Sequence, residues 1–128
     1  QKWVGDLNRL YRDEPALWAG ENSDHNFFWV DCSDVPNSIF SFVRQTPDCS
    51  RCILTILNLT SKIHEGYRVG LPQPGSWTEV LNSDSEFYGG SNAGNSGGLL
   101  SQEIPWHDQP WSAEFTLPGL SCSVFLHC

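Results

Sequence analysis

Seven short segments rich in β-branched or aromatic residues follow one another from residue 27 to the end of the chain. They span residues 27–31, 38–44, 52–58, 67–71, 77–81, 112–117 and 122–127. Turn-forming proline, asparagine, aspartate and glycine residues lie between most of them. Short strands at close spacing are typical of an antiparallel sandwich. We therefore predict an all-β fold, a Greek-key β-sandwich of about seven or eight strands.

A different period marks the first twenty residues. Apolar side chains recur there at the spacing of one helix face, namely Trp3, Leu7, Leu10, Tyr11, Leu17 and Trp18. Pro15 would interrupt a continuous helix, so the helix is expected to run to about Glu14. We predict one amphipathic N-terminal helix within residues 1–20 and a sandwich domain over residues 21–128.

Composition excludes several classes of partner. The chain has 128 residues, 39% of them hydrophobic, which suits one packed domain. Its formal charge of −8 argues against nucleic acid and anionic membranes, which attract basic surfaces. No apolar run approaches the roughly 20 residues that cross a bilayer. A neutral carbohydrate is indifferent to this charge. Because the sequence lacks methionine and starts with Gln1, we expect a domain cut from a longer polypeptide.

The cysteines offer a metal or redox interpretation that the spacing does not favour. Cys49 and Cys52 form a CxxC pair, but zinc needs about four ligands and the sequence has no second pair. The four histidines are widely scattered, and the CxxC lies in a turn leading into a strand rather than opening a helix. We therefore predict no metal and no cofactor, with the thiols reduced and some filling the core. The sequon at Asn58 would matter only in a secreted protein.

The stretch between residues 82 and 110 is unusually long for a compact domain. It is rich in glycine and asparagine after Tyr88, residue types that tolerate positive φ and suit a shaped polar loop. It opens no helix, so it lacks the setting of a nucleotide-binding loop. Long loops of this kind are often functional.

The sequence resembles the C-terminal β-domain of 1,4-α-glucan (glycogen or starch) branching enzymes in the α-amylase superfamily. Phe28-Trp29-Val30-Asp31-Cys32 resembles the first hairpin of that domain, and Tyr88-Gly89-Gly90-Ser91 its polar loop. The likeness is carried in order by residues 4–12, 15–17, 28–32, 37–42, 57–60, 66–70, 80–95, 110–112 and 115–120. Residues 47–52, 61–65 and Cys128 depart from it.

The resemblance implies a sandwich attached to a catalytic barrel, whose last helix would be residues 1–20. The parent would be a bacterial cytoplasmic or plastid enzyme that moves α-1,4-glucan segments to α-1,6 branches. A retaining reaction of this type needs two carboxylates about 5 Å apart, in this superfamily at barrel strand ends. Motifs for those residues are absent here, so no catalytic residue is expected in the fragment. The catalytic barrel of the parent is the expected partner.

Glucan binding is the sharper hypothesis for the fragment itself. Sugar rings stack on flat aromatic side chains while polar groups bond the hydroxyls. The candidates are Trp77, Tyr88, Asn92, Trp106 and Trp111. Tyr88 and Trp106 lie furthest from the strand signals, whereas tryptophans at strands usually pack in cores.

Three alternatives stay open from the sequence. The domain could only support the barrel, it could be a free-standing carbohydrate-binding module, or it could belong to another α-amylase superfamily enzyme. The apolar stripe on residues 1–20 also predicts a tendency to dimerise through that helix.

Overall fold

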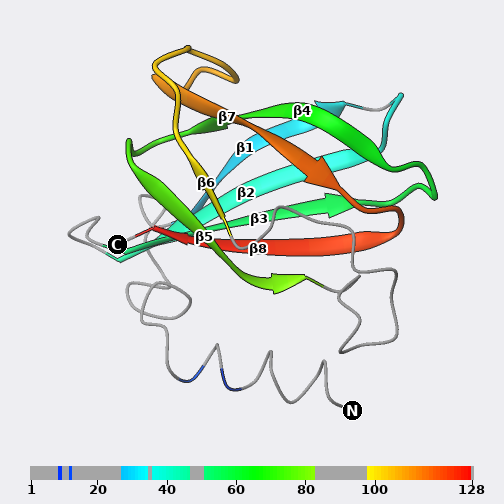
Figure 1. The fold of residues 1–128 in the computed structure, drawn as a ribbon, viewed down its shortest axis with the longest axis horizontal. Coiled ribbons are helices and arrows are strands. Elements are labelled where there is room, and N and C mark those ends of the chain that lie inside the picture. Colours follow the sequence, from blue (N-terminus) through cyan, green and yellow to red (C-terminus); the bar gives the residue numbers. More distant parts are fainter. Residues whose placement is uncertain are drawn as a thin grey trace.

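The structure, a computed structural model, describes Arg9, Arg12 and residues 27–34, 36–46, 51–82 and 98–127. The described residues contain eight strands (Figure 1). The strands are β1 (Phe27–Asp34), β2 (Ile39–Gln45), β3 (Cys52–Asn58), β4 (His64–Leu71), β5 (Ser76–Asn82), β6 (Gly98–Leu100), β7 (Trp111–Leu117) and β8 (Ser121–His127).

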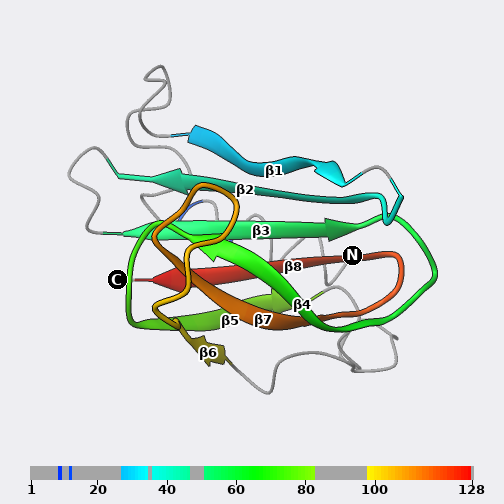
Figure 2. The same ribbon diagram turned by 90° about the horizontal axis from the view of Figure 1, so that it is seen from above.

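The strands form two sheets that pack face to face. The larger sheet has the order β1-β2-β3-β8-β5-β6, and β4 pairs with β7 in the smaller one. Every pairing between these strands is antiparallel. Figures 1 and 2 show β4 and β7 lying across the larger sheet, with β8 returning between β3 and β5. The chain crosses from β7 of the smaller sheet to β8 of the larger one through residues 118–120, and crossings between the two sheets are typical of Greek-key sandwiches. The predicted all-β antiparallel class is confirmed.

All seven predicted strands are present, with ends displaced by at most three residues. Only β6 was missed, because three residues inside a long polar segment carry no period that a sequence pattern can reveal. Of the predicted N-terminal helix the structure describes only Arg9 and Arg12, and the boundary near residue 20 lies outside the described residues, so both stay predictions.

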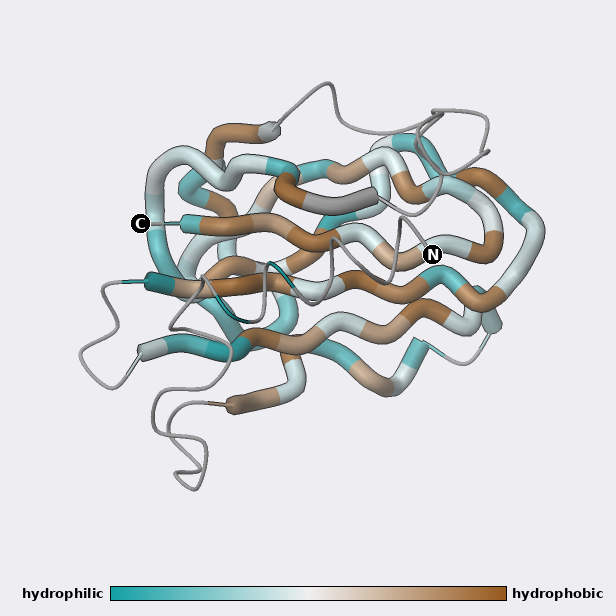
Figure 3. Tube along the Cα trace, turned by 90° about the horizontal axis from the view of Figure 1, so that it is seen from below, coloured by the Kyte–Doolittle hydropathy of each residue, from teal (hydrophilic) through white to brown (hydrophobic). Residues whose placement is uncertain are grey.

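Alternation along the strands explains where the core lies. In β2, buried residues Ile39, Ser41 and Val43 alternate with partly exposed ones, as expected for a strand with one face inward. The rings of Phe115 in β7 and Phe125 in β8 meet edge to face across the two sheets, with centroids 4.9 Å apart. Figure 3 shows hydrophobic residues recurring along the strands of the larger sheet. Burying side chains of this size contributes about 1.5–3 kcal/mol each.

A buried asparagine ties two loops together at one end of the sandwich. The Asn58 side chain is fully buried, and its Nδ2 donates to the carbonyl oxygens of Lys62 and Pro118 at 2.8 and 2.9 Å. Its Oδ1 accepts from the backbone N–H and the hydroxyl of Thr60, both at 3.1 Å. This amide is therefore a structural link and is inaccessible to a glycosylating enzyme in the folded chain.

Cys52 fills a core position at the start of β3. It is 1% exposed, and its Sγ donates to Oε1 of Gln45 at 3.4 Å. Its CxxC partner Cys49 lies outside the described residues. Within the part of the chain that the structure describes, no three His, Cys, Asp or Glu side chains are grouped to hold a metal ion. The same part contains no helix with the length and hydropathy needed to span a membrane.

Candidate functional site

Two irregularities in edge strand β1 turn a pair of aspartates toward the smaller sheet. The pairing with β2 shifts by one residue between Trp29 and Asp31, and again between Asp31 and Asp34. In a regular strand, residues three apart point to opposite faces. Here Asp31 lies opposite Ser41 and Asp34 opposite Ile39, and both of those β2 residues are buried on the inner face. Bulges re-aim side chains in this way, so both carboxylates reach the same rim.

Asp34 is joined to the smaller sheet by a hydrogen bond. The Tyr67 hydroxyl of β4 donates to Asp34 Oδ2, and the Asn37 amide donates to both carboxylate oxygens at 3.1 Å. Burial by itself raises the pKa of Asp34, but the hydrogen bonds from Tyr67 and Asn37 outweigh it and lower that pKa. Burial, reinforced by the Asp34 carboxylate, raises the pKa of Tyr67. This bond connects the edges of the two sheets.

A tight turn over β4 presents the exposed tryptophan of the site. The backbone N–H of Trp106 donates to the Gln109 carbonyl at 3.0 Å, and the reverse bond is 2.9 Å. The two residues between them, His107 and Asp108, have φ of 52° and 60°, the signs of a type I′ turn. Trp106 is 46% exposed, so this turn offers an indole to a ligand.

His107 reaches from this turn to both sheets. Its Nδ1 accepts a hydrogen bond from the backbone N–H of Gly70 at 3.2 Å. The proton of the neutral ring is thereby assigned to Nε2, which lies 3.4 Å from Asp31 Oδ2. The other oxygen of Asp31 accepts from the backbone and the hydroxyl of Ser33, at 3.2 and 2.8 Å. Both ring nitrogens of His107 thus face partners on different strands.

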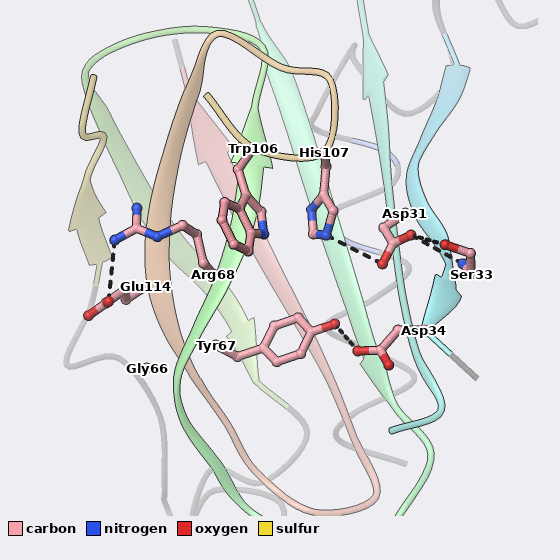
Figure 4. Close-up of a pocket in the computed structure, with 9 residues that line it drawn as sticks. All are labelled: Asp31, Ser33, Asp34, Gly66, Tyr67, Arg68, Trp106, His107 and Glu114. Carbon is pink, nitrogen blue, oxygen red and sulfur yellow. Dashed lines mark hydrogen bonds and ion pairs between the residues drawn. The ribbon is translucent and has the colours of Figure 1, made fainter. Parts of the chain in front are cut away.

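On the outer face of the smaller sheet, an arginine is held beside the same tryptophan. Arg68 donates from Nη1 to Ser112 Oγ at 2.7 Å and from Nη2 to Glu114 Oε2 at 3.2 Å. Figure 4 shows the Trp106 indole lying between Arg68 and His107. The Arg68–Glu114 pair is too exposed to stabilise the fold by much, because such pairs contribute about 0–1 kcal/mol. It does fix the direction of the guanidinium.

These side chains surround an open hollow of about 640 Å³, which we call the Trp106 groove. Its walls are Asp31, Ser33, Asp34, Gly66, Tyr67, Arg68, Trp106, His107 and Glu114 (Figure 4). An indole face flanked by hydrogen-bond donors and acceptors is the arrangement that binds neutral polar rings, because stacking and hydroxyl bonding act together.

The structure describes three of the five sequence candidates, and only one of those three lines the groove. Trp106 lines the groove. Trp77 is fully buried, with Nε1 donating to the Gln73 carbonyl at 3.2 Å, so it has no face to offer a ligand and we withdraw it as a binding candidate. Trp111 is partly buried against the core cluster and is absent from the groove lining. Tyr88 and Asn92 lie outside the described residues.

None of the polar side chains of the groove was among the candidates predicted from the sequence. No sequence pattern announces the two bulges that bring Asp31 and Asp34 to one face. The turn had a faint signal, because histidine and aspartate are among the few residues besides glycine and asparagine that tolerate positive φ. His107-Asp108 lacks the Asn-Gly or Asp-Gly signature by which such hairpins are usually found.

Fold and sequence together define the class of the chain. It belongs to the alpha amylase C-terminal all-beta domain family, whose model matches residues 29–128.

Individual relatives carry a more specific name. The chain is 50% identical to the 1,4-alpha-glucan branching enzyme GlgB of Gloeobacter violaceus over 98% of its length. It is 47% identical over 98% to the protein of that name from Saccharophagus degradans, and 45% over 97% to that of Synechocystis sp.. It spans only 16–17% of the length of these three relatives.

Proposed function

We propose that this chain is the C-terminal β-domain of a 1,4-α-glucan branching enzyme and that the Trp106 groove binds α-glucan. The single observation that carries the binding proposal is the exposed Trp106 indole, set beside an immobilised arginine and carboxylates. A glucose ring stacks its C–H face on the indole. Hydroxyl groups then donate to Glu114 or Asp31 and accept from Arg68.

The chemistry of the parent belongs to a part of the polypeptide outside this chain. The relatives named as branching enzymes are about six times longer than the stretch they share with it. That difference in length favours a domain of a larger enzyme over a free-standing binding module. In the groove, Asp34 already accepts bonds from Tyr67 and Asn37, which suits holding a ligand better than transferring protons. The parent would move α-1,4-glucan segments to α-1,6 branches in a bacterial cytoplasm or a plastid.

Supporting the catalytic barrel is the second role we propose for the domain. Deleting it from the full-length parent is then expected to lower the yield of soluble enzyme and its thermal stability. An enzyme of unchanged yield and melting temperature after the deletion would refute this supporting role.

Calorimetric titration of the 128-residue chain with maltoheptaose tests the binding proposal. Trp106→Ala is expected to weaken binding about tenfold or more, the equivalent of about 1.4 kcal/mol. Trp29→Ala is the matched control, because Trp29 is 50% exposed but packs against Phe27 and Phe42 outside the groove. Equal losses of affinity in the two variants, or no binding by the unsubstituted 128-residue chain, would refute the proposal.

Self-association through the N-terminal helix remains a separate proposal. Its support is the apolar stripe within residues 1–20. Sedimentation velocity at rising concentration should show a dimer that Leu10→Asp weakens. A monomer at every concentration would contradict it.

A further inference from the structure

We infer that His107 and Asp31 are positioning residues for Trp106: together they tie the turn that carries the indole to both sheets. The inference rests on the proposed function for its ligand, an α-glucan, but its structural part can be tested without one. It assigns a purpose to a histidine that sequence reasoning left among scattered residues.

The first support is the bridging geometry of the imidazole. His107 Nδ1 accepts a hydrogen bond from the backbone N–H of Gly70 at 3.2 Å, and Gly70 belongs to β4 of the smaller sheet. His107 Nε2 faces Asp31 of β1, in the larger sheet, at 3.4 Å. The side chains of His107 and Asp31 are 18% and 15% exposed, so solvent competes little for this contact. The ring therefore fixes the turn relative to both sheet edges.

The second support is backbone conformation. His107 and Asp108 both have positive φ, although neither is glycine. A left-handed conformation is unfavourable for a residue with a Cβ. Glycine or asparagine would adopt the positive φ of this turn more easily, but neither has an imidazole to place between the strands. The two contacts of the imidazole therefore account for a histidine at position 107.

The third support is that Asp31 is itself held in place. A bulge turns it to the inner face, and two bonds from Ser33 occupy its Oδ1, leaving Oδ2 toward the imidazole. Figure 4 shows His107 pointing across to Asp31 while Trp106 hangs beside it on the same turn. Removing either partner frees the turn to change the angle of the indole.

The structure supplies a matched control for this inference. The hydrogen bond from Tyr67 to Asp34 also joins β4 to β1, but neither residue belongs to the 106–109 turn. Tyr67→Phe removes an inter-sheet bond of similar placement without touching His107. If His107 and Asp31 only stabilised the fold, substitutions of His107, Asp31 and Tyr67 would change the surroundings of Trp106 alike.

Fluorine NMR of the 5-fluorotryptophan-labelled chain tests the inference, with the Trp106 resonance assigned by Trp106→Phe. His107→Asn keeps a residue that tolerates positive φ, and Asp31→Ala removes the carboxylate. Both are expected to shift or broaden the Trp106 signal while leaving that of buried Trp77 unchanged. Tyr67→Phe should leave the Trp77 signal unchanged and move the Trp106 signal less than His107→Asn does, because Tyr67 lines the groove but does not hold the turn. Maltoheptaose binding to His107→Asn should be roughly three- to tenfold weaker, the effect of about one hydrogen bond.

The outcomes separate this inference from the proposed function. A Trp106 signal unchanged in His107→Asn, or shifted equally in Tyr67→Phe, would overturn the positioning role. If the unsubstituted 128-residue chain does not bind maltoheptaose, only the proposed function is overturned, because the fluorine comparison needs no ligand. If Asp31→Ala unfolds, as judged by circular dichroism, the His107→Asn spectrum decides.

Discussion

The carbonyl oxygen of Trp106 lies 2.1 Å from the position that a Cβ would occupy on Gly70. Real Cβ contacts are never this short, so the turn can rest on β4 only because residue 70 has no side chain. The same glycine donates its N–H to His107. Close approach of backbone to backbone is one of the few tasks that require glycine, and here it brings the tryptophan to the edge of the groove.

Gly70→Ala is expected to lift the turn from β4 and to weaken maltoheptaose binding about tenfold. The added methyl group should also destabilise the fold by about 1–3 kcal/mol, the usual effect of overpacking. Urea unfolding and calorimetry measure the two effects. Gly66→Ala is a useful comparison, because the nearest atom to its Cβ would be 3.9 Å away and only its φ of 71° opposes the change. Unaltered binding in Gly70→Ala would contradict the proposed placement of the ligand.

Trp77→Ala should act on stability rather than on ligand contact. Trp77 is fully buried and its ring meets His127 edge to face at 5.0 Å. Removing a core tryptophan costs about 3–5 kcal/mol. Chemical denaturation should show this loss of stability. The molecules that remain folded should bind maltoheptaose with the affinity of the unsubstituted chain. A stable variant with weakened binding would instead return Trp77 to the binding site.

Alkaline pH should reveal the bond between Tyr67 and Asp34. Burial and the Asp34 carboxylate raise the pKa of Tyr67, so the folded tyrosine stays protonated where the unfolded one ionises, above about pH 10. Stability from this group is full below pH 10 and falls as the pH rises beyond it. Burial also raises the pKa of Cys122 to about 11, adding a loss of the same sign.

Tyr67→Phe isolates the tyrosine contribution because Cys122 is present in both chains. As the pH rises from about 9 to about 11, the urea midpoint should fall less steeply in the variant than in the unsubstituted chain. Parallel curves would show that Tyr67 titrates alike in the folded and unfolded states.

Asn58→Ala should destabilise the fold although it removes no apolar contact. The change removes the Asn58 bonds to the carbonyls of Lys62 and Pro118 and to the N–H of Thr60. The Pro118 carbonyl keeps its bond from the Ser121 hydroxyl at 2.6 Å. Since each intramolecular hydrogen bond contributes about 1 kcal/mol, we expect a total loss of about 3 kcal/mol. Leu59→Ala, at a neighbour that is 56% exposed, should change stability by less than about 0.5 kcal/mol. Thermal or urea unfolding of both variants makes the comparison.

The strands were predictable because their signal is local. β3 matched its predicted bounds, since an apolar run between turn residues reads directly as a buried strand. β6 was not predictable, because three residues carry no period. Trp77 illustrates a limit of composition: an aromatic beside a polar loop suggests a ligand site, but only the pairing of its strand reveals that it faces the core.

The groove depends on features that no local pattern records. Asp31 and Asp34 share a face only because β1 is bulged against β2. His107 meets Asp31 only because the smaller sheet lies across the larger one, bringing a turn near residue 107 to a strand near residue 31. Both juxtapositions depend on pairing between distant strands, which a pattern in a single sequence does not reveal. Trp106 was identified because it stood apart from every strand signal.

Amide chemical-shift mapping of the labelled 128-residue chain with maltoheptaose tests most directly whether the Trp106 groove holds glucan. The largest shifts are expected at residues 31–34, 66–70 and 106–109, with the indole N–H of Trp106 among them. Residues around Asn58, at the loops that Asn58 links, should not move. Shifts confined to other surfaces, or a spectrum unchanged at saturating sugar, would contradict the account.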